Sequence, residues 1–236
     1  MYLDLAESQK LAEAVAALTV PASITGVLFP STLALTSVQE KIKNTGWGIG
    51  AQNVAWAPKG AYTGAVSAEL FQAAGVRYAL IGHSERRHIF GETDTAVAKK
   101  IAACVAVGIA PVLCIGETAE DAAADKRQYR LRQQVTAALD GGPIPTKLII
   151  AYEPVWAISP GTPCTPADAD DVAGWLKLWL TENWGTAGTA VPILYGGSVD
   201  PDNISAFIHS ESLDGVLVGS QSTQASSFKA MLAQLS

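Results

Sequence analysis

Seven short apolar runs are spaced along the chain, and a pattern of apolar residues at helical spacing follows each of them. The runs cover residues 24–29, 48–52, 78–82, 110–114, 148–151, 193–195 and 216–218. No hairpin signal such as Asn-Gly joins one run to the next, so the alternation predicts parallel strands connected by crossover helices. A doubly wound sheet and a closed barrel both fit this pattern.

The segments between the runs carry signals for helix starts. An amphipathic helix is expected over about 4–18, ahead of the first run. Three later helices are expected to begin at residues that can cap a first turn: Thr118, Thr165 and Asp200. The helix after Thr118 is expected to end near residue 139, and the helix after Thr165 near residue 184.

The run at 148–151 leads into a carboxylate, Glu153, which Pro154 follows at once. A strand buried on both faces of a parallel sheet is apolar throughout, so Glu153 marks the point where the chain leaves the core and faces a cleft. Pro154 stops the strand and stiffens its exit. A solvated loop acid is the alternative interpretation, and the other strand ends must decide between the two.

Length and composition narrow the class of protein. A chain of 236 residues fits two small domains or one large barrel, and no linker divides it, so we predict a single domain over 1–236. Hydrophobic residues make up 49% and charged residues 16%, which allows a large buried core. The net charge of -6 argues against a nucleic-acid partner, although backbone N–H groups can still hold one phosphate.

The cysteines and the N-terminal segment bear on location. Cys104, Cys114 and Cys164 are odd in number and widely spaced, as is typical of a reducing cytoplasm and not of a disulfide scaffold. No apolar run approaches the roughly 20 residues of a membrane span, and Met1 leads directly into a polar segment. We therefore expect a soluble cytoplasmic protein without a membrane partner.

Residues that can carry chemistry follow other predicted strands. The carboxyl ends of the strands form the active site of a parallel barrel. The run at 78–82 ends in His83 and an ionic cluster at 84–87, with a helix-capping imidazole as the alternative. The last two runs end in turns that offer backbone N–H groups near helix starts, as a barrel phosphate site requires. The residues of these turns are Gly196, Gly197, Ser198, Gly219 and Ser220.

Two kinds of enzyme are not favoured. His83, His88 and His209 lie in separate contexts without a ligand-spaced carboxylate or cysteine cluster, so we expect no metal site. The turn at 196–198 does not extend to a dinucleotide fingerprint or to a phosphate loop with lysine, so no nucleotide cofactor is expected.

Four segments stand out in this order along the chain: Gly50-Ala-Gln-Asn-Val54, Gly82-His-Ser-Glu-Arg-Arg87, Ala151-Tyr-Glu-Pro-Val-Trp-Ala157 and Tyr195-Gly-Gly-Ser198. Together they resemble the signature segments of the triosephosphate isomerase family, and the resemblance covers essentially the whole chain. It implies an α/β fold, the (βα)8 TIM barrel. It also implies a cofactor-free isomerase of glycolysis and gluconeogenesis that interconverts dihydroxyacetone phosphate and glyceraldehyde 3-phosphate.

The resemblance also implies roles for individual residues. Glu153 matches the general base that moves a proton through an enediolate, and His83 matches the electrophile. Such a reaction needs a fixed donor for the developing oxyanion in a dry site, because the proton is weakly acidic. Glu85 matches an acid beside the site, and an ion pair with Arg86 or Arg87 is the alternative. Substrate phosphate contacts are implied at Ser159, Ser198, Gly219 and Ser220.

Two segments depart from the family pattern within the chain. Residues 157–165 correspond to a mobile lid whose tip is normally rich in glycine, whereas here Pro160 and Pro163 restrict φ and are expected to bias closure. Ser220 stands where a second glycine is usual, and its side chain is expected to crowd the phosphate.

The start of the chain is a third departure. Met1-Tyr-Leu aligns with the tail of the family's first strand, so we expect a barrel that lacks this strand and its Asn/Lys turn. Loss of such a lysine ordinarily costs several kcal/mol of transition-state stabilisation, and we expect impaired activity. A start at an internal methionine and a natural variant are the two explanations.

The segment 52–64 resembles the loop that family members insert into a partner subunit. Gln52, Tyr62 and Thr63 keep the family pattern, which implies a homodimer whose sites are completed across the interface. An exposed loop is the alternative. A second function class also remains open, in which a noncatalytic barrel binds a phosphorylated metabolite or a protein partner.

Overall fold

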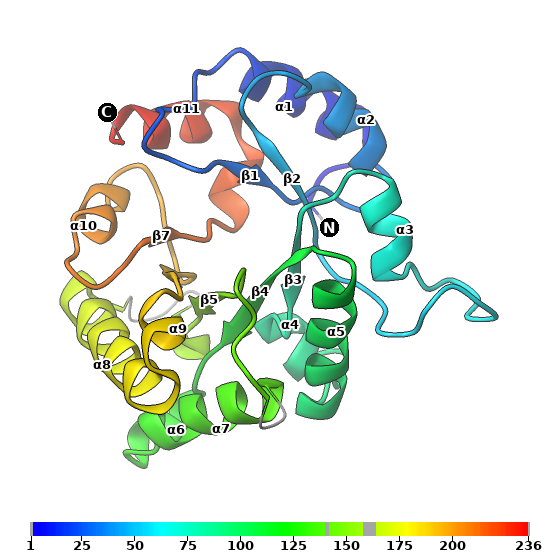
Figure 1. Cartoon of the computed structure of the whole chain (residues 1–236). Coiled ribbons are helices and arrows are strands. Elements are labelled where there is room, and N and C mark those ends of the chain that lie inside the picture. Colours follow the sequence, from blue (N-terminus) through cyan, green and yellow to red (C-terminus); the bar gives the residue numbers. More distant parts are fainter. Residues whose placement is uncertain (1, 140–141, 158–163, 236) are drawn as a thin grey trace.

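The computed structural model describes residues 2–139, 142–157 and 164–235. Seven short strands alternate with helices along this part of the chain, as the apolar runs predicted (Figure 1). The strands are β1 (Val27–Leu28), β2 (Gly48–Ala51), β3 (Tyr78–Ile81), β4 (Ala110–Ile115), β5 (Ile149–Tyr152), β6 (Ile193–Tyr195) and β7 (Gly215–Val216).

All seven strands belong to one parallel sheet whose spatial order, β1 to β7, is the order in the sequence. A doubly wound sheet would reverse direction at an inner strand, so the sequential order excludes that alternative. The sheet curls into a partial ring with the helices on its outside (Figure 1). No pairing joins β1 to β7 among the described residues, so the arrangement is that of a TIM barrel with one open seam.

Two apolar clusters lie on opposite faces of the sheet, because successive side chains of a strand alternate. Leu80, Val112, Cys114 and Ala151 form the smaller cluster. The larger one joins the other face of the strands to the surrounding helices. Every residue of β4 is buried, as expected of a central parallel strand covered on both faces.

The helices that flank the strands are α1 (Leu5–Ala16), α2 (Leu35–Lys41), α3 (Ala68–Ala73), α4 (Ser84–His88), α5 (Asp94–Ala106), α6 (Ala119–Ala123), α7 (Arg127–Leu139), α8 (Pro166–Trp184), α9 (Thr186–Thr189), α10 (Ile204–Ile208) and α11 (Ala225–Ala233). Short 3-10 helices occupy Val155–Ala157 (η1) and Ser220–Thr223 (η2). None of the helices in the described ranges has the length and apolar character needed to cross a membrane.

The predicted start of α8 is confirmed. The Thr165 hydroxyl accepts a hydrogen bond from the Asp168 N–H at 3.1 Å, and Pro166 occupies the first helical position. The helix also ends at Trp184, close to the predicted boundary. This cap matters for the site because it fixes the chain immediately after residues 158–163.

Two helix predictions were wrong. The single helix expected after Thr118 is divided into α6 and α7, because Asp125 adopts a left-handed conformation with φ 55° that breaks the helix. The helix expected at Asp200 begins only at Ile204. The Asp200 carboxylate instead accepts from the N–H groups of Asp202 and Asn203, an alternative to helix that short polar side chains offer.

Candidate active site

Glu153 directly follows β5 and lies almost fully inside the protein, with 2% of its surface exposed. Its backbone N–H donates to the Ile115 carbonyl at the end of β4, at 2.7 Å. Its Oε2 accepts a hydrogen bond from the Ser84 N–H at 3.0 Å, whereas Oε1 has no hydrogen-bond partner among the described residues. The interpretation as a solvated loop acid is therefore wrong, and one carboxylate oxygen is free to act on a ligand.

His83 lies at the end of β3 and faces this carboxylate. Its Nδ1 accepts the Glu85 N–H at 3.3 Å, which makes His83 the N-cap of α4. In a neutral imidazole this assigns the remaining proton to Nε2, which lies 3.4 Å from Glu153 Oε1. The capping alternative and the electrophile prediction are thus compatible, because the cap uses one ring nitrogen and directs the other at the site.

The environment of Glu153 shifts its proton affinity. Burial raises the pKa of Glu153, and this outweighs the opposite effects of His83, of the Ser84 N–H and of the Cys114 thiol. Burial, and then the Glu153 carboxylate, raise the pKa of Cys114 well above its usual value, so it remains a thiol. A carboxylate with a raised pKa is a stronger base than one in water, as proton abstraction beside a carbonyl requires.

Gly196, the first residue after β6, makes room for this carboxylate. A Cβ at this position would lie 2.8 Å from Glu153 Cγ. The sequence suggested that the glycines after β6 allow close approach of a phosphate. The structure gives Gly196 a further role, which is to let Glu153 lie against the neighbouring strand end.

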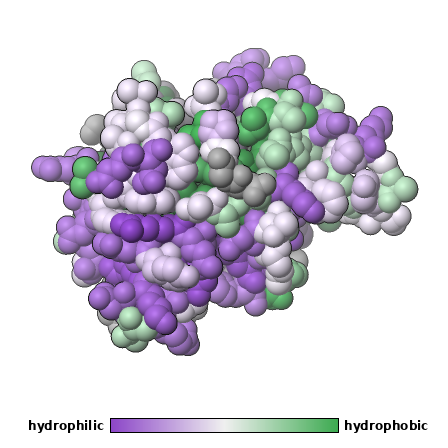
Figure 2. All heavy atoms as spheres, turned by 60° about the horizontal axis from the view of Figure 1, so that its bottom comes forward, coloured by the Kyte–Doolittle hydropathy of each residue, from purple (hydrophilic) through white to green (hydrophobic). Residues whose placement is uncertain are grey.

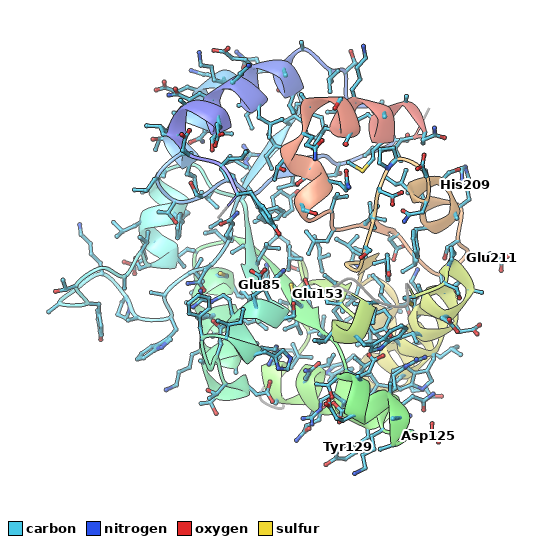
Figure 3. The ribbon with its side chains drawn as sticks, turned by 180° about the vertical axis from the view of Figure 1, so that it is seen from behind. Glu85, Asp125, Tyr129, Glu153, His209 and Glu211 are labelled. Carbon is cyan, nitrogen blue, oxygen red and sulfur yellow. The ribbon has the colours of Figure 1, made fainter. Side chains whose placement is uncertain are left out.

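Glu85 lies beside the imidazole but at the surface. Its Oε2 is 4.0 Å from His83 Nδ1, and its side chain is 62% exposed. Figure 3 shows the labelled Glu85 and Glu153 next to one another near the centre of the molecule in this view. The alternative of an ion pair with Arg86 or Arg87 is wrong, because these two side chains pair with Glu92 and Asp94.

The predicted phosphate residues lie at the ends of β6 and β7, two paired strands. The Ser198 hydroxyl donates to the Ala157 carbonyl at 2.9 Å, which joins the turn after β6 to the last residue before 158. Gly219 and Ser220 are exposed at the start of η2. Ser159 lies outside the described residues, as do Pro160 and Pro163.

The loop between β2 and α3 extends away from the body of the protein (Figure 1). In the space-filling view it forms a projection of mixed hydrophobic and hydrophilic residues (Figure 2). The Gln52 amide donates to the Phe29 carbonyl at 2.9 Å, which anchors the loop base to its own chain. Tyr62, which is half-exposed, packs edge-on against Trp56, and Thr63 is exposed.

Glu117 is a further buried acid, which the sequence analysis missed. Its Oε1 accepts from the Tyr152 hydroxyl at 3.0 Å and the Trp156 indole at 2.9 Å, and it pairs with Arg127 at 3.1 Å. These contacts hold η1 against the ends of β4 and β5. The available signal was the one that pointed to Glu153, namely an acid just after a buried apolar strand.

Among the described residues, no group of three or more His, Cys, Asp or Glu side chains is arranged to hold a metal ion.

Comparison with known proteins gives a consistent result. The family model described as triosephosphate isomerase matches residues 1–235. A triosephosphate isomerase of Nitratidesulfovibrio vulgaris (strain Miyazaki F) is 39% identical, over 98% of this chain and 95% of that protein. One of Caldanaerobacter subterraneus subsp. tengcongensis is 40% identical, over 97% and 93% of the two chains. One of Symbiobacterium thermophilum is 42% identical, over 88% and 82%.

The match to this family covers almost the whole length of the chain. The strand order and the two facing side chains at the ends of β3 and β5 agree with it. The chain belongs to the triosephosphate isomerase family.

Proposed function

We propose that this protein interconverts dihydroxyacetone phosphate and glyceraldehyde 3-phosphate without a cofactor. The observation that carries the proposal is the contact between Glu153 and His83. A buried carboxylate with one free oxygen faces the Nε2 of a histidine at 3.4 Å, at the carboxyl ends of parallel strands. The relatives of this protein described above are named triosephosphate isomerase.

The two side chains have complementary tasks in this reaction. Glu153 Oε1 takes a proton from the carbon beside the substrate carbonyl and returns it to the neighbouring carbon, so an enediolate forms between the two steps. His83 Nε2 donates to the carbonyl oxygen on which negative charge develops, and it relays the hydroxyl proton from one substrate oxygen to the other, so that the hydroxyl and the carbonyl exchange places. A donor that is already oriented stabilises this charge without further reorganisation, which lowers the barrier. Burial supports both steps, because it raises the basicity of Glu153 and excludes water.

We propose that the substrate phosphate binds at the ends of β6 and β7. Ser198, Gly219 and Ser220 lie on these two neighbouring strand ends, which is where barrels of this kind bind phosphate. Ser159 is proposed to add a backbone N–H. Glu85 is proposed to hold His83 in its tautomer through its N–H, and not to transfer a proton itself.

Substitution of the proposed base gives the first test. Glu153→Gln should lower kcat by about a hundredfold to ten-thousandfold, the usual contribution of a positioned general base. A coupled assay measures the rate in both directions. Glu211→Gln is the matched control, because Glu211 is exposed and lies at the edge of the molecule (Figure 3). An unchanged rate in Glu153→Gln would remove the proposed mechanism.

The same assay separates catalysis from the noncatalytic alternative. It compares the 236-residue chain with one extended upstream by the family's first-strand sequence. Activity in either form supports the isomerase. Absence of activity in both, with binding of a triose phosphate retained, supports a binding module.

Glu153 should also make stability depend on pH. The pKa of Glu153 in the folded protein lies above the unfolded value of about 4.3. Below the unfolded pKa the carboxyl is protonated in both states and does not affect the free energy of unfolding, and the wild type loses stability as pH rises through the folded pKa. The amide introduced by Glu153→Gln keeps an oxygen for the Ser84 N–H but carries no charge. This variant should therefore melt higher than wild type at pH 8, and the difference should shrink toward pH 4. A difference in Tm that does not vary with pH would contradict the raised pKa.

We also propose a homodimer in which the loop 52–64 enters a partner subunit. The support is its projection from the body and the half-exposed aromatic pair that it carries, Trp56 and Tyr62. Equilibrium sedimentation should give twice the chain mass at micromolar concentration. Deletion of residues 60–63 should shift the equilibrium to monomer. A wild-type chain that sediments only as a monomer would refute the proposal.

We further propose that residues 1–236 form one domain of a cytoplasmic protein. The support is the single continuous sheet and the three buried free thiols, which suit a reducing compartment.

A further inference from the structure

A buried charged cluster lies behind the turn that carries His83. Glu92, in the connection between α4 and α5, has only 4% of its side chain exposed, and Lys100 of α5 has 8%. Glu92 Oε2 accepts from Lys100 Nζ at 2.5 Å and from Arg86 Nε at 2.6 Å. Glu92 Oε1 accepts from the backbone N–H of Gly82 at 3.1 Å. The proposed proton transfer uses none of these side chains, so the cluster needs a separate explanation.

Gly82, the residue just before His83, is held on both sides. Glu92 binds its N–H, and its carbonyl accepts from Arg87 Nε at 2.6 Å. Arg87 is in turn paired with Asp94 at 2.5 Å. Gly82 has a φ of +72°, in the left-handed region that other residues rarely adopt. Opposed ionic contacts thus fix an unusual backbone conformation directly before the imidazole.

The conformation of Gly82 sets the direction in which His83 leaves the strand. The imidazole must keep its Nε2 toward the space in front of Glu153 Oε1, 3.4 Å away. A displacement of about 1 Å in such a group can cost about a hundredfold in rate. We propose that Glu92, held by Lys100 and Arg86, is a positioning residue that fixes the Gly82 turn and through it His83. This inference rests on the proposed isomerase function.

The charge on Glu92 suits this task. Burial raises the pKa of Glu92, but hydrogen bonds and charge from Lys100 and Arg86 outweigh burial, so its pKa lies below the usual value. Burial also lowers the pKa of Lys100, which favours its neutral form and weakens its ion pair with Glu92. Arg86 still pairs with the Glu92 carboxylate whether or not Lys100 is charged. An ionised carboxylate only accepts hydrogen bonds and can serve all three donors, whereas an amide would point its own NH₂ at one of them.

Lys100 extends the cluster to the projecting loop. Its Nζ also donates to the Asn53 side-chain oxygen at 2.7 Å, at the base of that loop. A buried ion pair is weak evidence of added stability, because desolvation offsets much of the attraction. The charged cluster binds the backbone N–H of Gly82, directly before His83, and this favours a role in orienting the imidazole.

Glu92→Gln in the full chain tests the inference. It should lower kcat about tenfold to a hundredfold and leave KM and inhibition by inorganic phosphate within about twofold, because the proposed phosphate residues lie on other strands. The His83 imidazole ¹⁵N resonances should shift in histidine-labelled protein. His83→Gln assigns these resonances among the three histidines.

Asp214→Asn is the matched control. This carboxylate also accepts from a strand N–H, that of Ile193 at 2.8 Å, and pairs with Lys177 at 3.0 Å. It lies before β7, at the opposite ends of the strands from Glu153. The control should lower Tm yet leave kcat and the His83 resonances unchanged.

Arg87→Lys keeps a cation for Asp94 but loses the guanidinium donor to Gly82, and it serves if Glu92→Gln does not fold. It should also lower kcat and shift the His83 resonances. A normal kcat or unmoved His83 resonances in a folded variant overturns the inference. A wild type without isomerase activity defeats the proposed function instead, and the resonances still report whether Glu92 orients the imidazole.

Discussion

The hydrogen bond from the Ser84 N–H to Glu153 Oε2 is the contact on which the site depends. It spans the ends of β3 and β5 across the intervening β4 and holds a carboxylate in a place where solvent would otherwise be needed. Burial of a carboxylate with one oxygen unpaired is unfavourable, and the surrounding structure holds Glu153 in this position. Gly196 leaves space for the side chain, the Ile115 carbonyl anchors its backbone, and the Gly82 turn brings His83 to its free oxygen.

Three buried carboxylates in the same part of the barrel differ in how they are satisfied. Glu92 accepts hydrogen bonds on both oxygens from two cations and a backbone N–H. Glu117 concentrates three donors on one oxygen, and these fix the segment before residue 158. Glu153 alone of the three directs an unpaired oxygen at an imidazole. The first two acids stabilise the geometry, and we propose the third as the reactive group.

Local sequence patterns were sufficient to predict the strands and to place Glu153 and His83 at strand ends, whereas the barrel and the roles of these two residues came from the family resemblance. Apolar runs that end in Glu153 and His83 report burial and strand ends directly, and the parallel order then brings them together. The contacts of Glu92 with Lys100 and Gly82 were not predictable, because they join separate segments whose charges have several possible partners. The same uncertainty made the Glu85 ion pair wrong. The break at Asp125 was also missed, since a left-handed aspartate leaves little local signal.

The central claim is that Glu153 moves a proton between adjacent carbons in a site that His83 polarises. Isomerisation of dihydroxyacetone phosphate in D₂O, with mass analysis of the trapped product, tests it most directly. A proton carried by a carboxylate exchanges with solvent while the enediolate persists, so the product should contain deuterium on the carbon beside the carbonyl. Deuterium incorporation at the wild-type rate in Glu153→Gln would mean that another group moves the proton, and it would contradict the account.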